Sequence, residues 1–347
     1  MYVIKDTKFI LIPLAFNEFC NDISSLRDSS KYVGKIHSRR IVDKNVLTDV
    51  INYCACNDDV PIVIDMNNII SYCNRDFNRL LSLSCSKIII TRIDINLIDR
   101  VNEDLKGHYI KNKNALCSSD EMVDFYKHNK DDITNIDHIE ILNVVQWMKQ
   151  CVNKENITEL RPLDSSGVFC NMYINVKKLF VDPLNYYYVI YQMICMIDNS
   201  NIAFDALVSV SRNGANIAEI IGWLLNKKVI YCPSLGPKFS LATYMVENKI
   251  RKNGKYVYIF DFMCLGTEAK MLNALLSFAG ANLVGGFGIA NYIDLEQRYQ
   301  FSVINKMNSL IDVQREKIGY RIAGSKEEIG DMLVEEKEEY GTRLFEV

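Results

Sequence analysis

The sequence lacks the features that would place this protein in a membrane or on a nucleic acid. No apolar run approaches the roughly 20 residues that a helix needs to cross a bilayer. A formal net charge of -3 over 347 residues supplies no overall attraction to nucleic acid or to anionic lipid. Partners must therefore be recognised locally, and a hydrophobic share of 49% is typical of a globular protein.

Metal-binding and disulfide patterns are missing too. The eleven cysteines are scattered singly apart from Cys54 and Cys56, and none has the Cys-x-x-Cys spacing of a zinc site. The four histidines share no metal-ligand spacing, so we assign no metal ligands. The opening MYVIKDTKFILIPLAF is interrupted by charges and lacks a cleavage site, which favours a strand over a signal peptide. Cysteines in such numbers without a disulfide framework suggest a reducing compartment, so together with the lack of a membrane-spanning run we expect a cytoplasmic protein.

The length allows two domains, and two regions alternate apolar strands with amphipathic helices, which predicts an α/β fold. In the first region we expect helices around Asn45–Cys54 and Arg75–Leu83 and strands at Pro61–Met66 and Lys87–Thr91. Its boundaries are set at 1–107, followed by a polar linker and a helix over 108–156. The helix is expected at His138–Val152.

The larger domain is expected over 157–325, and an acidic helical tail over 326–347. The crossover lengths predict parallel pairing of its strands. The predicted strands are Val168–Val176, Ala206–Val210, Lys228–Cys232, Lys255–Phe260 and Asn282–Ile289. The predicted helices are Leu184–Ile197, Ala215–Leu225 and Glu268–Phe278.

Ligands of open parallel sheets bind beyond the carboxyl ends of the strands. Two loops of the larger domain follow predicted strands in this way. Ser211-Arg212-Asn213-Gly214-Ala215 follows one strand and opens a helix, so that backbone N–H groups and the helix dipole favour an anion. Asp261 to Ala269 follows another strand. The alternative for the first loop is a plain turn with a solvated Arg212, and for Asp261 a capping carboxylate.

Three stretches in order resemble the type I phosphoribosyltransferases, most closely the orotate enzymes. LDSSGVFCNMYINVKKLFVDP is similar to their hood segment, with an Asp-Pro helix start. VSVSRNGANIAEIIGWLL is similar to their pyrophosphate loop and helix. GKYVYIFDFMCLGTEAKMLNALLSFAGANLVGGFGIANY is similar to the strand, signature loop, helix and strand that follow. The resemblance covers about half of the chain and implies a parallel-sheet phosphoribosyltransferase fold that acts as a homodimer.

The resemblance also implies a ligand, phosphoribosyl pyrophosphate (PRPP). Ser211, Arg212, Asn213, Gly214 and Ala215 would hold the pyrophosphate, Asp261 the ribose, and the backbone of Cys264, Leu265, Gly266, Thr267 and Glu268 the 5'-phosphate. Asp261 is the one candidate catalytic residue. Mg²⁺ is expected only together with PRPP, bridging its oxygens.

The loop departs from the family pattern in three places. Phe260 stands where the family has the first of two adjacent acidic residues. Cys264 and Leu265 replace residues that include a phosphate-binding hydroxyl. Glu268 either opposes a phosphate or faces solvent as a helix-stabilising carboxylate. Lys238 is the one basic residue in the first part of the interval that would hold a mobile lysine loop, with Lys249, Arg251 and Lys252 nearer the next strand.

The first region is weakly similar to STAS-like domains, in which a strand ending in Asp leads into a turn. That resemblance implies a protein partner and makes Ser71 the nearest match to a switch serine, while the alternative is a plain α/β subdomain.

Two hypotheses follow for the whole chain. The favoured one is a PRPP- or nucleotide-binding regulatory or partner-binding protein with a degraded loop, a combination that suggests a bacterial antiphage system. The alternative is an active Mg²⁺-dependent phosphoribosyltransferase that uses a nucleobase-like acceptor.

Overall fold

The computed structural model describes residues 1–25, 40–57, 59–72, 87–94, 96–97, 108–110, 115–153, 169–170, 173–174, 176–232, 250–264, 266–292, 306–312 and 322–323. The chain divides into two compact units, Met1–Asn143 and Val144–Val347, which are described separately. No helix in the described ranges is long and apolar enough to span a membrane.

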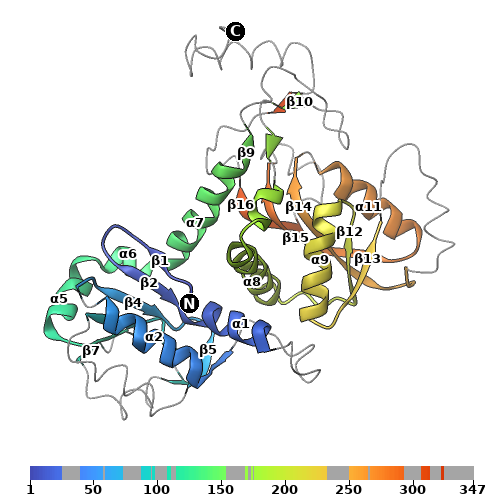
Figure 1. Ribbon diagram of the computed structural model, residues 1–347. Coiled ribbons are helices and arrows are strands. Elements are labelled where there is room, and N and C mark those ends of the chain that lie inside the picture. The colour runs from blue at the N-terminus through green and yellow to red at the C-terminus, as the bar shows by residue number, and fades with distance from the viewer. Residues whose placement is uncertain are drawn as a thin grey trace, which may run out of the picture. The chain divides into compact units, whose positions relative to one another are not determined.

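The first unit contains a mixed six-stranded sheet ordered β1-β2-β4-β6-β8-β7 (Figure 1). Its inner strands β2, β4 and β6 are parallel, and the flanking pairs are antiparallel. The strands are β1 (Ile4–Lys5), β2 (Ile10–Pro13), β4 (Ile62–Asp65), β6 (Ile88–Thr91), β7 (His108–Ile110) and β8 (Ala115–Cys117), with a separate pair β3 (Arg40–Val42) and β5 (Ile69–Tyr72). Every residue of β4 and β6 is buried, as expected for strands covered on both faces.

The helices of this unit begin where the local sequence supplies caps. They are α1 (Leu14–Ser25), α2 (Lys44–Cys56), α5 (Asp120–His128), α6 (Lys130–Thr134) and the first half of α7 (Ile136–Cys151). The carboxylate of Asp43 accepts the Asn45 N–H at 2.8 Å, and Ser119 Oγ accepts the Met122 N–H at 3.3 Å, so each satisfies a donor of the first helical turn. The predicted helix around Asn45–Cys54 and both predicted strands are confirmed.

The first sheet extends beyond residue 107, where the sequence placed its end. β7 and β8 lie within the predicted linker and pair with each other and, through β8, with β6. β8 has three residues, all buried, which is too short a run for periodicity to register. Ser71 lies in β5 opposite Ile41, and not in the turn where the STAS-like resemblance put it. The predicted helix at Arg75–Leu83 lies outside the described residues.

The second unit is built on a five-stranded parallel sheet ordered β13-β12-β14-β15-β16. The strands are β12 (Ala206–Ser209), β13 (Lys228–Tyr231), β14 (Lys255–Met263), β15 (Asn282–Asn291) and β16 (Met307–Asp312). The predicted parallel α/β class is confirmed. β16 was not predicted, and β14 continues past Phe260 to include Asp261, Phe262 and Met263.

Helices cover both faces of this sheet (Figure 1). They are α8 (Pro183–Asn199), α9 (Arg212–Leu224) and α11 (Thr267–Phe278). α11 packs in one apolar cluster with Tyr256, Tyr258 and Phe260 of β14. α9 packs on the other side of β14, where its Gly214 approaches the Ile259 carbonyl. Asp182 caps α8 by accepting the Leu184 N–H at 2.9 Å, which confirms the predicted Asp-Pro helix start.

The hood-like segment is only partly described. In place of one strand over Val168–Val176, the structure has two short strands, β10 (Phe169–Cys170) and β11 (Tyr173–Ile174), followed by a 3-10 helix, η2 (Val176–Phe180). β10 pairs with β17 (Ile322–Ala323) and β11 with β9 (Val152–Asn153), both antiparallel. The acidic tail over 326–347 lies outside the described residues.

Candidate functional site

Two loop segments that the sequence singled out meet at the carboxyl edge of the second sheet. Because β12 and β14 are adjacent and parallel, Ser211 and Asp261 emerge at the same edge, where ligands of such sheets bind. Ser211 Oγ donates to Asp261 Oδ1 at 2.9 Å, and Asn213 Nδ2 donates to Asp261 Oδ2 at 2.9 Å. All three side chains are half-buried. We call Ser211, Asn213 and Asp261 the Asp261 cluster.

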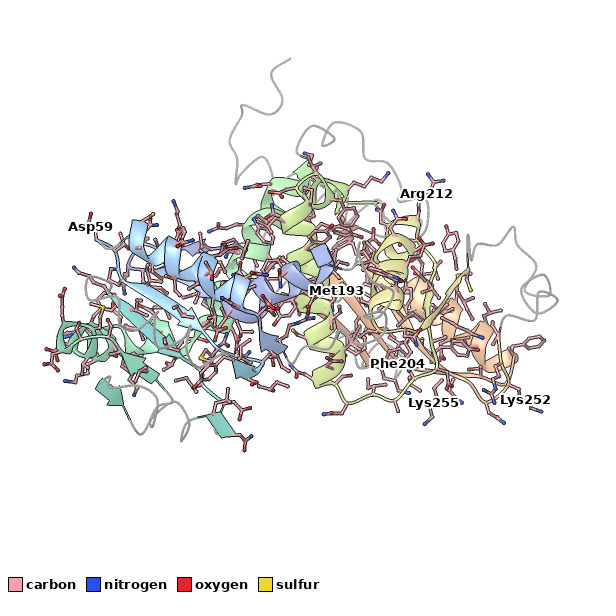
Figure 2. The ribbon with its side chains drawn as sticks, turned by 60° about the horizontal axis from the view of Figure 1, so that its bottom comes forward. Asp59, Met193, Phe204, Arg212, Lys252 and Lys255 are labelled. Carbon is pink, nitrogen blue, oxygen red and sulfur yellow. The ribbon has the colours of Figure 1, made fainter. Side chains whose placement is uncertain are left out.

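The predicted pyrophosphate loop is the first turn of α9. Ser211 is the N-cap: its Oγ accepts the Gly214 N–H at 3.0 Å, and its carbonyl accepts the Ala215 N–H at 2.9 Å. These two N–H groups are therefore bonded within the first turn of the helix, and the role of this loop in holding a pyrophosphate stays a prediction. The positive end of the helix dipole remains at this edge, and the exposed Arg212 side chain projects from it (Figure 2).

Gly214 is required by a close approach between α9 and β14. A Cβ atom at this position would lie 2.6 Å from Ser209 Oγ, 2.8 Å from Ser211 Oγ and 2.9 Å from the Ile259 carbonyl oxygen. Only glycine lets the start of the helix sit this near the strand. The short distance is what brings the Ser211 and Asn213 side chains within reach of Asp261.

The side chains of Phe260 and Asp261 lie on opposite faces of the sheet, because successive side chains of a strand point to opposite faces. Phe260 is 1% exposed and belongs to the apolar cluster under α11; its ring centroid is 5.3 Å from that of Tyr258. The space above its ring comes from Gly288 of β15, where a Cβ would lie 2.1 Å from a ring carbon. The position that carries an acid in the resembled family is therefore a core position in this chain.

The turn before α11 is set by Gly266, whose φ of 67° is in the left-handed region that favours glycine. Thr267 begins the helix and is half-buried, as is Cys264, while Leu265 lies outside the described residues.

Glu268 is half-buried, and its carboxyl has a hydrogen-bond partner within the protein. Tyr258, buried beneath α11, donates its hydroxyl to Glu268 Oε2 at 2.9 Å. Burial raises the pKa of the Glu268 carboxyl, the Tyr258 hydrogen bond opposes that shift, and the nearby Asp261 charge adds to it. The carboxyl is thus held toward the α11–β14 core.

The described basic residues just before β14 and at its start lie at the opposite edge of the sheet from this site. Lys252 and Lys255 are exposed and stand at the amino end of β14, opposite the end that bears Arg212 (Figure 2). Lys238 and Lys249 lie outside the described residues. Among the described ones, Arg212 is thus the cation nearest in sequence to the Asp261 cluster.

Asn291 is a candidate that the sequence analysis missed. It ends β15, opposite Met263 of β14 and Asp312 of β16. It is 0% exposed, and neither its Nδ2 nor its Oδ1 has a hydrogen-bond partner among the described residues. The signal for it was a lone polar residue at the end of the apolar run GGFGIAN, at the same edge as Asp261.

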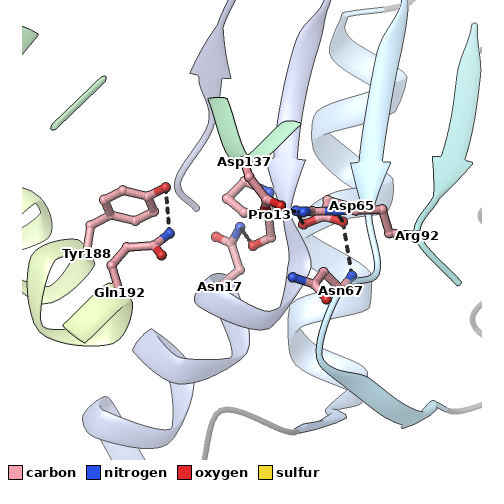
Figure 3. Close-up of polar contacts among 8 residues, drawn as sticks. All are labelled: Pro13, Asn17, Asp65, Asn67, Arg92, Asp137, Tyr188 and Gln192. Atoms are coloured by element: carbon pink, nitrogen blue, oxygen red, sulfur yellow. Dashed lines mark hydrogen bonds and ion pairs between the residues drawn. The ribbon is translucent and has the colours of Figure 1, made fainter. Parts of the chain in front are cut away.

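Like Asp261 in the second unit, Asp65 in the first unit is an acidic residue at the end of a parallel strand. Its carboxylate oxygens, however, already accept hydrogen bonds from other residues (Figure 3). Arg92 Nε donates to Oδ1 at 2.7 Å and Nη2 to Oδ2 at 2.5 Å, while the Asn67 N–H also donates to Oδ1 at 3.0 Å. Arg92 Nη1 pairs with Asp137. Burial lowers the pKa of Arg92, but the Asp65 charge and hydrogen bonds outweigh it and the pKa is raised. We interpret this closed pair as structural.

The described residues contain no group of three or more His, Cys, Asp or Glu side chains that could hold a metal ion. Asp261 offers a single carboxylate. Mg²⁺ often binds one or two carboxylates and completes its shell with ligand phosphates and water, so this donor fits an ion that arrives with a phosphorylated ligand.

No family model and no curated protein matches the chain. Solved structures that match it include orotate phosphoribosyltransferase from Aeropyrum pernix, 17% identical, covering 52% of this chain and 99% of that one with a TM-score of 0.39. Another is adenine phosphoribosyltransferase from Saccharomyces cerevisiae, 13% identical, covering 49% and 99% with a TM-score of 0.38. A third is UMP synthase from Leishmania donovani, 13% identical, covering 85% and 60% with a TM-score of 0.39. Two of these three proteins are named as phosphoribosyltransferases and the third as a UMP synthase.

Proposed function

We propose that the second unit binds a phosphorylated ribose compound, PRPP or a nucleotide, at the carboxyl edge of its parallel sheet. The observation that carries the proposal is the Asp261 cluster. One carboxylate is held in place by the Ser211 hydroxyl and the Asn213 amide, at the first turn of α9. A carboxylate accepts hydrogen bonds from ribose hydroxyls, and helix starts attract phosphate.

We further propose binding without efficient turnover, in a regulatory or partner-binding protein. Transfer of a ribosyl group needs electrostatic stabilisation of a cationic centre and of a leaving pyrophosphate. Phe260 supplies no charge, the Gly214 and Ala215 N–H groups are used within α9, and Glu268 is tied to Tyr258. The site therefore keeps a carboxylate that can bind a ribose, but it has few charged or N–H groups that could stabilise the transition state of the transfer.

The alternative function is an active phosphoribosyltransferase. Asp261 and Thr267 favour it, since both stand at the edge where a ribose 5-phosphate would lie. If Mg²⁺ enters with PRPP, Asp261 is the residue that would touch it, and the ion would neutralise pyrophosphate charge. The chain's own part is to orient the ribose through Asp261 and to position Asp261 through Ser211 and Asn213.

The remaining parts of the proposal concern setting and assembly. We place the protein in the cytoplasm, because the eleven cysteines are scattered without the spacing of a disulfide framework, a usage that suits a reducing compartment. A homodimer through the second unit, a protein partner on the first and a role in antiphage defence follow from the sequence resemblances.

Isothermal titration of the full chain with PRPP and Mg²⁺ tests binding, and pyrophosphate release with a panel of nucleobases tests turnover. Asp261→Asn should abolish or strongly weaken PRPP binding. Asp205→Asn is a matched control, because Asp205 also accepts a hydrogen bond, from the Lys255 N–H at 2.8 Å, but at the amino edge of the same sheet. Binding without pyrophosphate release supports the regulatory protein; release that Asp261→Asn abolishes supports the enzyme. No PRPP or nucleotide binding at any concentration refutes both.

A further inference from the structure

The side chain of Asn291 has a hydrogen-bonding capacity that no other described residue uses. A carboxamide offers two N–H donors and one carbonyl acceptor. Both polar atoms of Asn291 are buried without a partner, although each buried, unpaired polar group costs about 1–3 kcal/mol. Most buried polar groups in proteins are paired, so an exception needs an explanation.

The position of Asn291 near the Asp261 cluster supplies an explanation for its unpaired amide. Asp261 lies one strand away, two residues nearer the amino end than the Met263 that faces Asn291 across the sheet. Neighbouring strands are about 5 Å apart and two residues span about 7 Å along a strand. Asn291 is therefore within the length of a nucleoside of the Asp261 cluster, at the same carboxyl edge.

We propose that Asn291 reads the base of a nucleotide whose ribose is held by Asp261; this inference rests on the proposed function. An asparagine side chain can bind in bidentate fashion to a base edge that presents an acceptor beside a donor. A ligand with such an edge satisfies Nδ2 and Oδ1 together. Asn291 is a specificity-determining residue in this view, and binding of the base needs a local opening, since the amide is shielded from solvent.

The competing explanation is purely structural: an unpaired or water-bridged amide that takes no part in binding. The two differ in what Asn291→Leu does. Leucine removes both polar atoms at similar volume, so the thermal stability should be unchanged or higher in either case. Only the base-reading role predicts a selective change in ligand affinity.

The experiment compares two probes on the full chain by calorimetry: ribose 5-phosphate, which has no base, and the four nucleoside monophosphates. We expect at least one nucleotide to bind wild type more tightly than ribose 5-phosphate does. Asn291→Leu should weaken that nucleotide about 5- to 150-fold, the range of a good bidentate contact, and leave ribose 5-phosphate unchanged. Asn282→Leu is the matched control, because Asn282 is an exposed asparagine at the other end of β15.

Each outcome decides between the alternatives. Equal nucleotide affinity in Asn291→Leu and Asn282→Leu overturns the inference, as does an equal loss for ribose 5-phosphate and nucleotide. If wild type binds ribose 5-phosphate but no nucleotide more tightly, the inference fails while the proposed function stands; if it binds neither, both fail. Should Asn291→Leu not fold, Asn291→Asp keeps the shape and exchanges the amide for a carboxyl. It should change the order of preference among the four nucleotides, and an unchanged order refutes the role.

Discussion

Ser211 and Asp261, fifty residues apart in the chain, are joined by a hydrogen bond of 2.9 Å from hydroxyl to carboxylate. The same hydroxyl oxygen accepts the Gly214 N–H, so one side chain both caps α9 and positions the carboxylate. The start of the helix and the proposed ligand-binding group are therefore coupled.

Removing the Ser211 hydroxyl should weaken the second unit. Ser211→Ala loses the cap and the bond to Asp261, and we expect the free energy of unfolding to fall by about 1–2 kcal/mol. Ser211→Thr should recover most of it. The measurement is urea denaturation, followed through the transition of the second unit. If Ser211→Ala and Asp261→Asn prove additive in a double-mutant cycle, the two residues are not coupled.

Gly288→Ala tests the packing of Phe260. The added methyl group meets the Phe260 ring, and overpacking of this kind costs about 1–3 kcal/mol. Phe260→Leu in the same chain should recover part of the loss, because it removes the ring atoms that the methyl group meets. Gly285→Ala is the control, since its Cβ would first meet the end of the Ile202 side chain at 2.9 Å, which can rotate away. Equal losses for both alanine variants would contradict the packing argument.

Glu268→Gln should change the dependence of stability on pH. The folded-state pKa of Glu268 is raised above its ordinary value of 4.5, chiefly by burial. The folded chain therefore holds this proton more strongly, and stability is lost as the pH rises from that value through the raised pKa. Glutamine keeps an acceptor for Tyr258 without the charge. Relative to wild type, Glu268→Gln should have no stabilising effect at low pH. The effect should grow as the pH rises from 4.5 through the raised pKa of Glu268, as measured by thermal melting across pH. A difference between wild type and variant that is constant with pH would refute the shift.

Arg92→Ala should destabilise the first unit strongly. Asp65 is 5% exposed at its side chain and Arg92 18%, so the change leaves a buried charge without its partner, at a cost of about 3–5 kcal/mol. Lys127→Ala is the control: Lys127 pairs with Asp124 at 3.0 Å, but both side chains are largely exposed, and such pairs contribute about 0–1 kcal/mol. Guanidinium chloride denaturation of the two variants compares them. A loss for Arg92→Ala as small as for the control would mean that Asp65 reaches solvent.

The sequence predicted the parts of the fold that rest on long apolar runs. β12, the helices α8 and α11 and the start of β14 were predicted close to their observed bounds. Short elements such as β8 carried too few residues for a period to show. The end of β14 was misplaced since Asp261 is polar, although its hydrogen bonds to Ser211 and Asn213 make it an acceptable strand residue.

The sequence predicted which segments would form the candidate site, but it did not predict the contacts between their side chains. Both segments could be located because they follow strands, but the bond between Ser211 and Asp261 depends on the close approach at Gly214, which no local pattern encodes. The inward orientation of Glu268 depends on Tyr258, ten residues earlier on a different element. Asn291 stood out only once its burial was known.

The contact between Gly288 and Phe260 also limits how the sequence can change. An acid placed at position 260 in a single step would bury a charge beside Tyr258 and leave the space under Gly288 unfilled, and both effects are destabilising. Placing two neighbouring carboxylates at positions 260 and 261 thus requires several substitutions in concert, on β14 and β15 together. Position 260 is in this sense closed to a single charged substitution, whichever ligand the second unit binds.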